Sequence, residues 1–157
     1  MSLRLFLFNP ENDLALASGV ENYTPPPAAR KIRQDLQLLP IWLAEKGDSV
    51  FVNSNTQSGQ HYLNELEQRN FLSGVGLWHP GLSVTFDSIY PWGWSPALTK
   101  ELKTMGINAV VNVKKLRELS HRRTSIHILS WLSQHNPELF NGVLPKECTM
   151  WKEVLQH

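Results

Sequence analysis

Short apolar runs alternate with helical patterns along the first two thirds of the chain. Residues 3–8 are apolar apart from Arg4, and turn residues follow them at once. A run of this length predicts a strand buried on both faces, as in a parallel sheet. Further strands are expected at 49–53, 84–90 and 107–111. Strands and helices alternating at this spacing indicate βαβ crossovers, which predicts an α/β fold with a Rossmann-like three-layer parallel sheet.

Prolines and glycines mark where the helices begin and end. A proline keeps the preceding residue out of the α region, so Pro27 is the earliest helical position after the Pro25-Pro26-Pro27 run. We expect a helix from there to Gly47, with a kink at Pro40. A second helix carries the apolar residues Tyr62, Leu63 and Leu66. In a third, Ser95 is the expected N-cap, Pro96 the first residue and Gly106 the end.

The pattern changes after Asn112. One or two basic helices are expected between 113 and 133, then an extended segment at 143–145 and a short helix from Thr149 to His157. Residues 1–113 hold eight Lys/Arg against ten Asp/Glu, whereas residues 114–157 hold seven against four. The sequence therefore predicts a Rossmann-like domain over 1–113 and a mostly helical segment over 114–157.

Composition excludes several classes of protein. The 157 residues carry a net charge of +1, so no global charge favours nucleic acid, and no apolar run is long enough to span a membrane. The apolar run at 3–8 is too short for a signal peptide, which predicts a soluble cytoplasmic protein. One cysteine, Cys148, excludes an internal disulfide and a four-cysteine zinc site.

Tryptophan is abundant while charge is scarce. Six tryptophans accompany a charged fraction of only 18%, below the typical quarter. A face that packs against another domain would account for both, and we therefore expect an exposed apolar patch or a dimer.

The first candidate site follows the first expected strand. Asn9, Glu11, Asn12 and Asp13 lie there, where ligands bind in open α/β sheets. The loop lacks the glycines of a phosphate loop, and its carboxylates suit an amine, a hydroxyl or a metal better than phosphate. The structural alternative is a proline turn in which Asn12 or Asp13 caps a short helix over 14–17.

A second candidate lies at the strand-to-helix junction around Gly93. Trp92 and Trp94 could stack on a base or a sugar, and Arg122 or Arg123 could add a cation–π contact. The alternative is that these tryptophans pack beneath the helix that follows them.

The third candidate is the basic stretch 114–123, which has five Lys/Arg in ten residues. It could bind phosphate or nucleic acid, but its leucines favour an amphipathic helix with a solvated basic face. The histidines show no metal-ligand spacing, and no motif indicates catalytic residues.

The order of these segments resembles the N-terminal, pre-ATP-grasp part of ATP-grasp enzymes. The resemblance rests on Val110-Val111-Asn112, the helix into Leu119-Ser120-His121-Arg122-Arg123, and Val143-Leu144-Pro145 leading to Thr149. The segment Phe8–Ala17 also looks like that of an uncharacterised bacterial group of ATP-grasp-like proteins. His121-Arg122 stands where the family has an Asp-Lys pair, which is a departure from the pattern.

The resemblance implies the substrate-side domain of an ATP-grasp-like carboxylate–amine ligase. Substrate contacts are then Asn9, Glu11, Asn12, Asp13 and Trp94, while His121, Arg122 and Arg123 lie near the domain junction or a phosphate. The segments that bind ATP and magnesium in the family would follow His157, so this segment alone is expected to lack catalytic and metal-binding residues. Its expected partners are a small-molecule substrate and either its own C-terminal ATP-grasp domain or a second copy.

Two alternatives remain at this stage. One is a non-catalytic Rossmann-like module that binds a nucleotide, a sugar or a protein through Trp92, Trp94 and the basic helix. The other is nucleic-acid binding through 114–123, which ranks last because the basic charge is balanced elsewhere in the chain.

Overall fold

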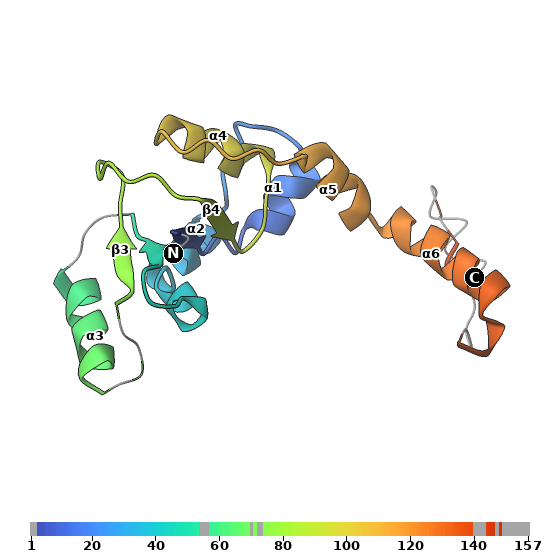
Figure 1. Ribbon diagram of the computed structural model, residues 1–157. Coiled ribbons are helices and arrows are strands. Elements are labelled where there is room, and N and C mark those ends of the chain that lie inside the picture. The colour runs from blue at the N-terminus through green and yellow to red at the C-terminus, as the bar shows by residue number, and fades with distance from the viewer. Residues whose placement is uncertain are drawn as a thin grey trace. The chain divides into compact units, whose positions relative to one another are not determined.

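The chain divides into two compact units, Met1–Val113 and Lys114–His157, and each is described by itself. The computed structural model describes residues 3–53, 57–69, 71, 74–139, 144–146 and 148. Figure 1 shows both units and labels α1 to α6, β3 and β4.

The first unit is built on a four-stranded sheet in which all pairs are parallel. Its strands are β1 (Arg4–Leu7), β2 (Ser49–Phe51), β3 (Gly76–Trp78) and β4 (Ser88–Pro91). Their order across the sheet is β3-β2-β1-β4. The prediction of an α/β fold with a parallel sheet is therefore confirmed. The order reverses at β1, which pairs with β2 on one side and with β4 on the other.

The helices of the described residues are mostly short. In the first unit they are α1 (Asn12–Ser18), α2 (Pro27–Asp35), the 3-10 helix η1 (Leu39–Leu43), α3 (Gln57–Gln68) and α4 (Pro96–Thr104). α5 (Val113–Ser120) begins at the last residue of that unit, and α6 (Arg122–His135) and the 3-10 helix η2 (Pro137–Leu139) follow in the second.

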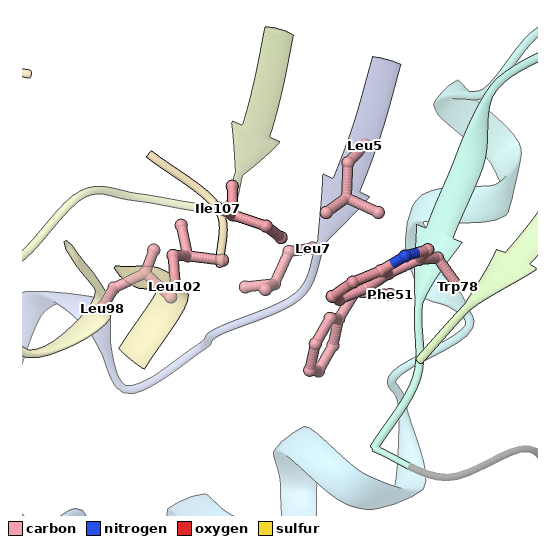
Figure 2. Packing of buried hydrophobic residues seen from close by; sticks show 7 residues of the cluster. All are labelled: Leu5, Leu7, Phe51, Trp78, Leu98, Leu102 and Ile107. Carbon is pink, nitrogen blue, oxygen red and sulfur yellow. The ribbon is translucent and has the colours of Figure 1, made fainter. Parts of the chain in front are cut away.

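Alternate residues of β1 enter two separate hydrophobic clusters, because successive side chains of a strand point to opposite faces. Leu5 and Leu7 pack with Phe51 and Trp78 and with three residues from α4 and its C-terminal side, Leu98, Leu102 and Ile107 (Figure 2). Phe6 packs on the other face with Ile41 of η1, Val50 of β2 and Leu63 and Leu66 of α3. The sheet is thus packed on both faces, as the near-continuous apolar run at 3–8 requires.

An ion pair joins the first strand to the turn before the second. Arg4 donates from Nε to Oδ1 of Asp48 at 2.8 Å and from an η nitrogen to Oδ2 at 2.7 Å, and the Glu45 backbone N–H also donates to Oδ2. Asp48 is only 2% exposed. Burial opposes its ionisation, but these hydrogen bonds outweigh burial and hold the pKa of Asp48 below its usual value.

The prolines predict where the helices begin more accurately than the prolines and glycines predict where they end. α2 begins at Pro27 and α4 at Pro96, and the Leu98 backbone N–H donates to Oγ of Ser95, so the expected N-cap is confirmed. The prediction of a single helix from Pro27 to Gly47 is wrong in its length. It ends at Asp35, and Pro40 lies in the first turn of η1, where its missing N–H costs nothing.

The strand predictions need three corrections. β4 covers 88–91 rather than 84–90, and β3, which no expectation covered, is a strand of only three residues. Residues 107–111 form no strand. Ile107 is buried in the core, but the Val110 side chain is fully exposed, so this segment is not embedded in the sheet.

The expectation of one or two basic helices between 113 and 133 is confirmed as the pair α5 and α6. The segment expected at 143–145 lies only partly within the described residues. The helix expected over 149–157 lies outside them.

Replacing Leu102 by Ala tests the cluster beneath α4. Leu102 is completely buried, so the substitution should lower the free energy of unfolding by about 2–5 kcal/mol through lost burial and a cavity. Leu14→Ala, at an exposed helical leucine, is the control and should change it by about 0.5 kcal/mol or less. Urea unfolding of both variants measures the difference, and equal losses would contradict this core assignment.

The Arg4–Asp48 pair should make stability depend on acid pH. A carboxyl whose pKa is lowered by folding stabilises the fold above its unfolded pKa, near 3.9, and that contribution is lost as pH falls through the folded pKa. Asp48→Asn should therefore melt several degrees below the wild type at pH 7, with the gap closing toward pH 3. Asp35→Asn, at an exposed carboxylate, should keep the wild-type profile. A gap for Asp48→Asn that stays constant with pH would refute this role.

Candidate functional site

Two loops meet at the carboxyl ends of β1 and β4, the strands between which the sheet order reverses. Asn9, the second residue after β1, donates from Nδ2 to the Gly93 carbonyl at 2.8 Å and accepts the Gly93 N–H at Oδ1 at 3.3 Å. Asn9 is only 2% exposed. Beyond the ends of the strands, the Asn9 side-chain amide thus pairs with the Gly93 backbone as a neighbouring strand would. This pairing holds the loop after β1 against the loop after β4.

Glu11, two residues after Asn9 in the same loop, is buried beside the guanidinium of Arg33. Glu11 Oε1 accepts a hydrogen bond from Arg33 of α2 at 3.0 Å, and only 7% of Glu11 is exposed. The same guanidinium also donates from both η nitrogens to Glu101 of α4, at 3.2 and 2.7 Å. Arg33 therefore joins the β1 loop, α2 and α4.

Gly93 permits a close approach that any larger residue would block. A Cβ placed on Gly93 would overlap Cγ and Nδ2 of Asn12, the first residue of α1. Asn12 is buried, and its side-chain oxygen has no hydrogen-bond partner. The expected cap by Asn12 or Asp13 is not observed, because Glu11 is the N-cap of α1 and makes no side-chain capping bond.

The other predicted substrate contacts lie elsewhere. Asp13 is exposed on α1. Trp94 packs against the cluster beneath α4 and lines a groove beside β4, together with residues of 107–111. Trp94 therefore packs beneath the helix that follows it, which is the alternative to ligand binding given for the second candidate site. Trp92, in contrast, is 64% exposed and meets the Phe8 ring edge-on at a centroid distance of 5.5 Å.

A polar cavity of about 290 Å³ lies beside the joined loops. Asn9 and Glu11 line it from the β1 loop, and Ser95 from the start of α4. Its charged and amide side chains are Asn9, Glu11, Glu21, Asn22, Arg33, Lys100 and Glu101. The cavity therefore brings Asn9 and Glu11 of the predicted set together, while Asn12 supports its wall from behind Gly93.

Five charged or amide residues of this cavity escaped the sequence-based prediction: Glu21, Asn22, Arg33, Lys100 and Glu101. Arg33 lies on a helix with no buried residue, and its role arises only when α2 is placed against α4. Lys100 donates to the Asn22 side chain across 78 residues of sequence. No periodicity or spacing in the chain marks such pairs.

A separate apolar groove of about 470 Å³ lies on the Phe6 face of the sheet. Phe6 stacks on Tyr90 of β4 at a centroid distance of 5.2 Å, and Trp42 of η1 and Trp92 complete the aromatic lining. Tyr90, Trp42 and Trp92 are all exposed. Exposed aromatic side chains thus gather along this groove, and whether they meet another domain or a second copy stays a prediction.

In the second unit the basic stretch 114–123 covers α5 from its second residue onward and the start of α6. His121 is the N-cap of α6, and its Nδ1 accepts the Arg123 backbone N–H at 3.1 Å. Lys114, Arg117, Glu118, His121 and Arg123 line a shallow pocket of about 360 Å³. His121 and Arg123 are thus brought together, whereas Arg122, also exposed, is not part of that lining.

Two further observations concern the part of the chain that the structure describes. It contains no group of three His, Cys, Asp or Glu side chains able to hold a metal ion. None of its helices has both the length and the hydropathy needed to cross a lipid bilayer.

Comparison with known proteins adds no assignment: the chain matches no protein-family model, no curated protein and no solved structure.

Replacing Gly93 by Ala should destabilise the first unit through the overlap with Asn12. We expect a loss of about 1–3 kcal/mol, typical of overpacking at a close contact. Adding Asn12→Ala should recover part of that loss, because the double substitution removes the overlap. Gly76→Ala is the control, since the nearest atoms to a Cβ there are the Ser49 hydroxyl at 3.3 Å and the Asp48 carbonyl at 3.7 Å, neither of which overlaps it as Asn12 overlaps a Cβ at Gly93. Strictly additive losses in urea unfolding would show that the two residues do not interact.

Proposed function

We propose that the first unit is a Rossmann-like domain that binds a small polar substrate, as the substrate-side part of an ATP-grasp-like carboxylate–amine ligase. The observation that carries the proposal is the position of the polar cavity. It adjoins the carboxyl ends of β1 and β4, where the strand order reverses, and open α/β sheets bind their ligands at such switch points.

The size and lining of the cavity suit a small polar molecule. Its volume of about 290 Å³ lies at the lower end of the range for ligand pockets. Buried Glu11 and half-buried Arg33 offer charged contacts, and Asn9 and Ser95 form a rigid wall beside them. Such a fixed polar wall orients a substrate without requiring the loops to become ordered on binding.

This cavity does not suit ATP with magnesium. Three carboxylates and two cations line it, and the described residues hold no metal-binding cluster. The three carboxylates of this lining would repel phosphate groups, whereas sites of phosphoryl transfer surround the nucleotide with cations and metal ions. We therefore assign only substrate binding to this unit and derive no step through ATP. The ligase part of the proposal rests on the resemblance of segments 8–17 and 110–123 to ATP-grasp proteins.

The second candidate function is a non-catalytic module that binds a planar ligand or a protein. The observation in its favour is the exposed aromatic groove with Trp92 and Trp42, which lies apart from the polar cavity. The two functions differ in which residues a ligand touches, so variants of each site separate them.

Thermal unfolding with a panel of small amines, amino acids, sugars and nucleotides tests the proposal. A cavity ligand should raise the melting temperature with or without Mg²⁺, since binding at about 100 times Kd stabilises a fold by about 2.7 kcal/mol. Ala97→Phe should abolish the effect, because Ala97 lines the cavity, whereas Ala28→Phe on exposed α2 should keep it. ATP with Mg²⁺ should have no effect.

Two results would count against the proposal. A panel that leaves the melting temperature unchanged would remove the small-molecule function. Stabilisation by a nucleotide that survives Ala97→Phe but is lost in Trp92→Ala would favour the aromatic groove and the second candidate.

A further inference from the structure

The aromatic groove on the Phe6 face of the sheet is an open surface rather than an enclosed pocket. Leu43, Tyr90 and Trp92 all line it, and they are 66%, 49% and 64% exposed. Its volume of about 470 Å³ would hold a small molecule, but pockets for small molecules cover most of the ligand that they bind. Lining residues this exposed leave one side of an occupant in water, which suits a peptide lying along the surface.

The exposed rings of the groove come from separate parts of the first unit and are held in place. Trp42 lies on η1, Tyr90 on β4 and Trp92 in the loop after β4. Tyr90 stacks on Phe6 at a centroid distance of 5.2 Å, and Trp92 meets the edge of the Phe8 ring at 5.5 Å. Large, fixed rings supply contact area at a low cost in conformational entropy.

The polarity of the lining restricts the chemistry of the partner. None of the described residues that line the groove is charged. The polar side-chain groups of the lining are the indole N–H groups of Trp42 and Trp92 and the hydroxyl of Tyr90. An indole N–H can only donate a hydrogen bond. Complementarity of charge and hydrogen bonding therefore calls for an uncharged partner that presents acceptors.

Backbone geometry distinguishes the ways in which a peptide could occupy the groove. A helix bonds its own carbonyls and would leave the indole donors unused. An added strand pairs with a sheet edge, whereas Phe6 and Tyr90 belong to strands that pair with each other. A polyproline II helix has no internal hydrogen bonds, so its carbonyls remain acceptors, and its three-residue repeat returns proline rings to one side. Aromatic-lined grooves bind proline-rich segments in this conformation.

The chain's own proline run does not supply such a segment. Pro26 has polyproline II geometry, with φ −54° and ψ 151°. Pro27, however, is the first residue of α2, and Pro25 lines the polar cavity. Because one polyproline turn takes three residues, the run is too short to lie across several rings. The segment must therefore come from another protein.

We infer that the aromatic groove binds an uncharged, proline-rich segment of a partner protein in the polyproline II conformation. Its proline rings pack on Trp42, Tyr90 and Trp92, and the indole N–H groups donate to its carbonyls. Because proline-rich chains adopt this conformation before binding, little entropy is lost when they bind. The inference goes beyond substrate binding at the polar cavity and does not depend on it. It gives the second candidate function a specific partner.

Isothermal titration of the whole chain with two capped peptides tests the inference. Acetylated and amidated hexaproline is an uncharged polyproline II segment of two turns. A capped Gly-Ser repeat of the same length is also uncharged, but it is flexible and has no rings. Hexaproline should bind at least about tenfold more tightly than this repeat, because it adds ring contacts and loses less entropy. Equal affinities, or no binding of hexaproline, would overturn the inference.

Variants of the tryptophans locate the contact. Trp92→Ala should weaken hexaproline binding about tenfold, as truncation of an aromatic anchor does. Trp42→Ala removes a ring from a different element and should have a similar effect, so the test survives if one variant fails to fold. Trp131→Ala is the matched control, because Trp131 of α6 in the second unit is as exposed as Trp42, at 55% and 54%. Hexaproline binding that is unchanged in folded Trp92→Ala or Trp42→Ala would contradict the assignment.

Ala97→Phe separates this inference from substrate binding. That substitution fills the polar cavity and should leave hexaproline binding unchanged. If hexaproline binds and no small molecule occupies the cavity, the inference stands and the substrate proposal fails, whereas the converse result overturns the inference alone. Binding of a planar compound, or self-association of the chain, that depends on Trp92 while hexaproline does not bind would give the groove another occupant and overturn the inference.

Discussion

The reversal of strand order at β1 is the constraint on which the site depends. Because β4 pairs with β1 rather than extending the sheet beyond β3, two loops far apart in the sequence emerge side by side. The reciprocal bonds between Asn9 and Gly93 then fix them together, and the close contact of Gly93 with Asn12 sets the start of α1. Glu11 is placed by that arrangement, and Arg33 binds it to α2 and α4.

Local signals in the sequence predicted those parts of the fold that local physics decides. The apolar run at 3–8, the Pro27 helix start and the Ser95 cap all lie where expected. The three-residue strand β3 is too short to show a period, and the apolar stretch at 107–111 looked like a strand although it pairs with none. Whether a short apolar segment joins a sheet depends on the edge available to it, which a single sequence does not show.

The candidate site could likewise be predicted only in part, because some of its residues are marked by local sequence signals and others meet only in the folded chain. Asn9 and Glu11 stand directly after a strand, so their position at the ligand-binding edge followed from the sequence. Arg33 and Glu101 are separated by 68 residues and meet only in the folded chain. The tryptophans that the structure describes also divide: Trp78 and Trp94 pack with the core, while Trp42, Trp92 and Trp131 are exposed. High tryptophan content thus reflects both the core and the aromatic surface.

The central claim is that a small ligand binds where the β1 and β4 loops meet. Backbone amide shifts from ¹⁵N NMR, followed during titration with the compound of the thermal-unfolding panel that stabilises the fold most, test it most directly. The account predicts that the largest shifts fall on residues 9, 11 and 12, on 93–95 and around Arg33 and Glu101, with little change in α3 or β3. Shifts confined to η1 and the exposed aromatic residues, or to α5 and α6, would contradict it.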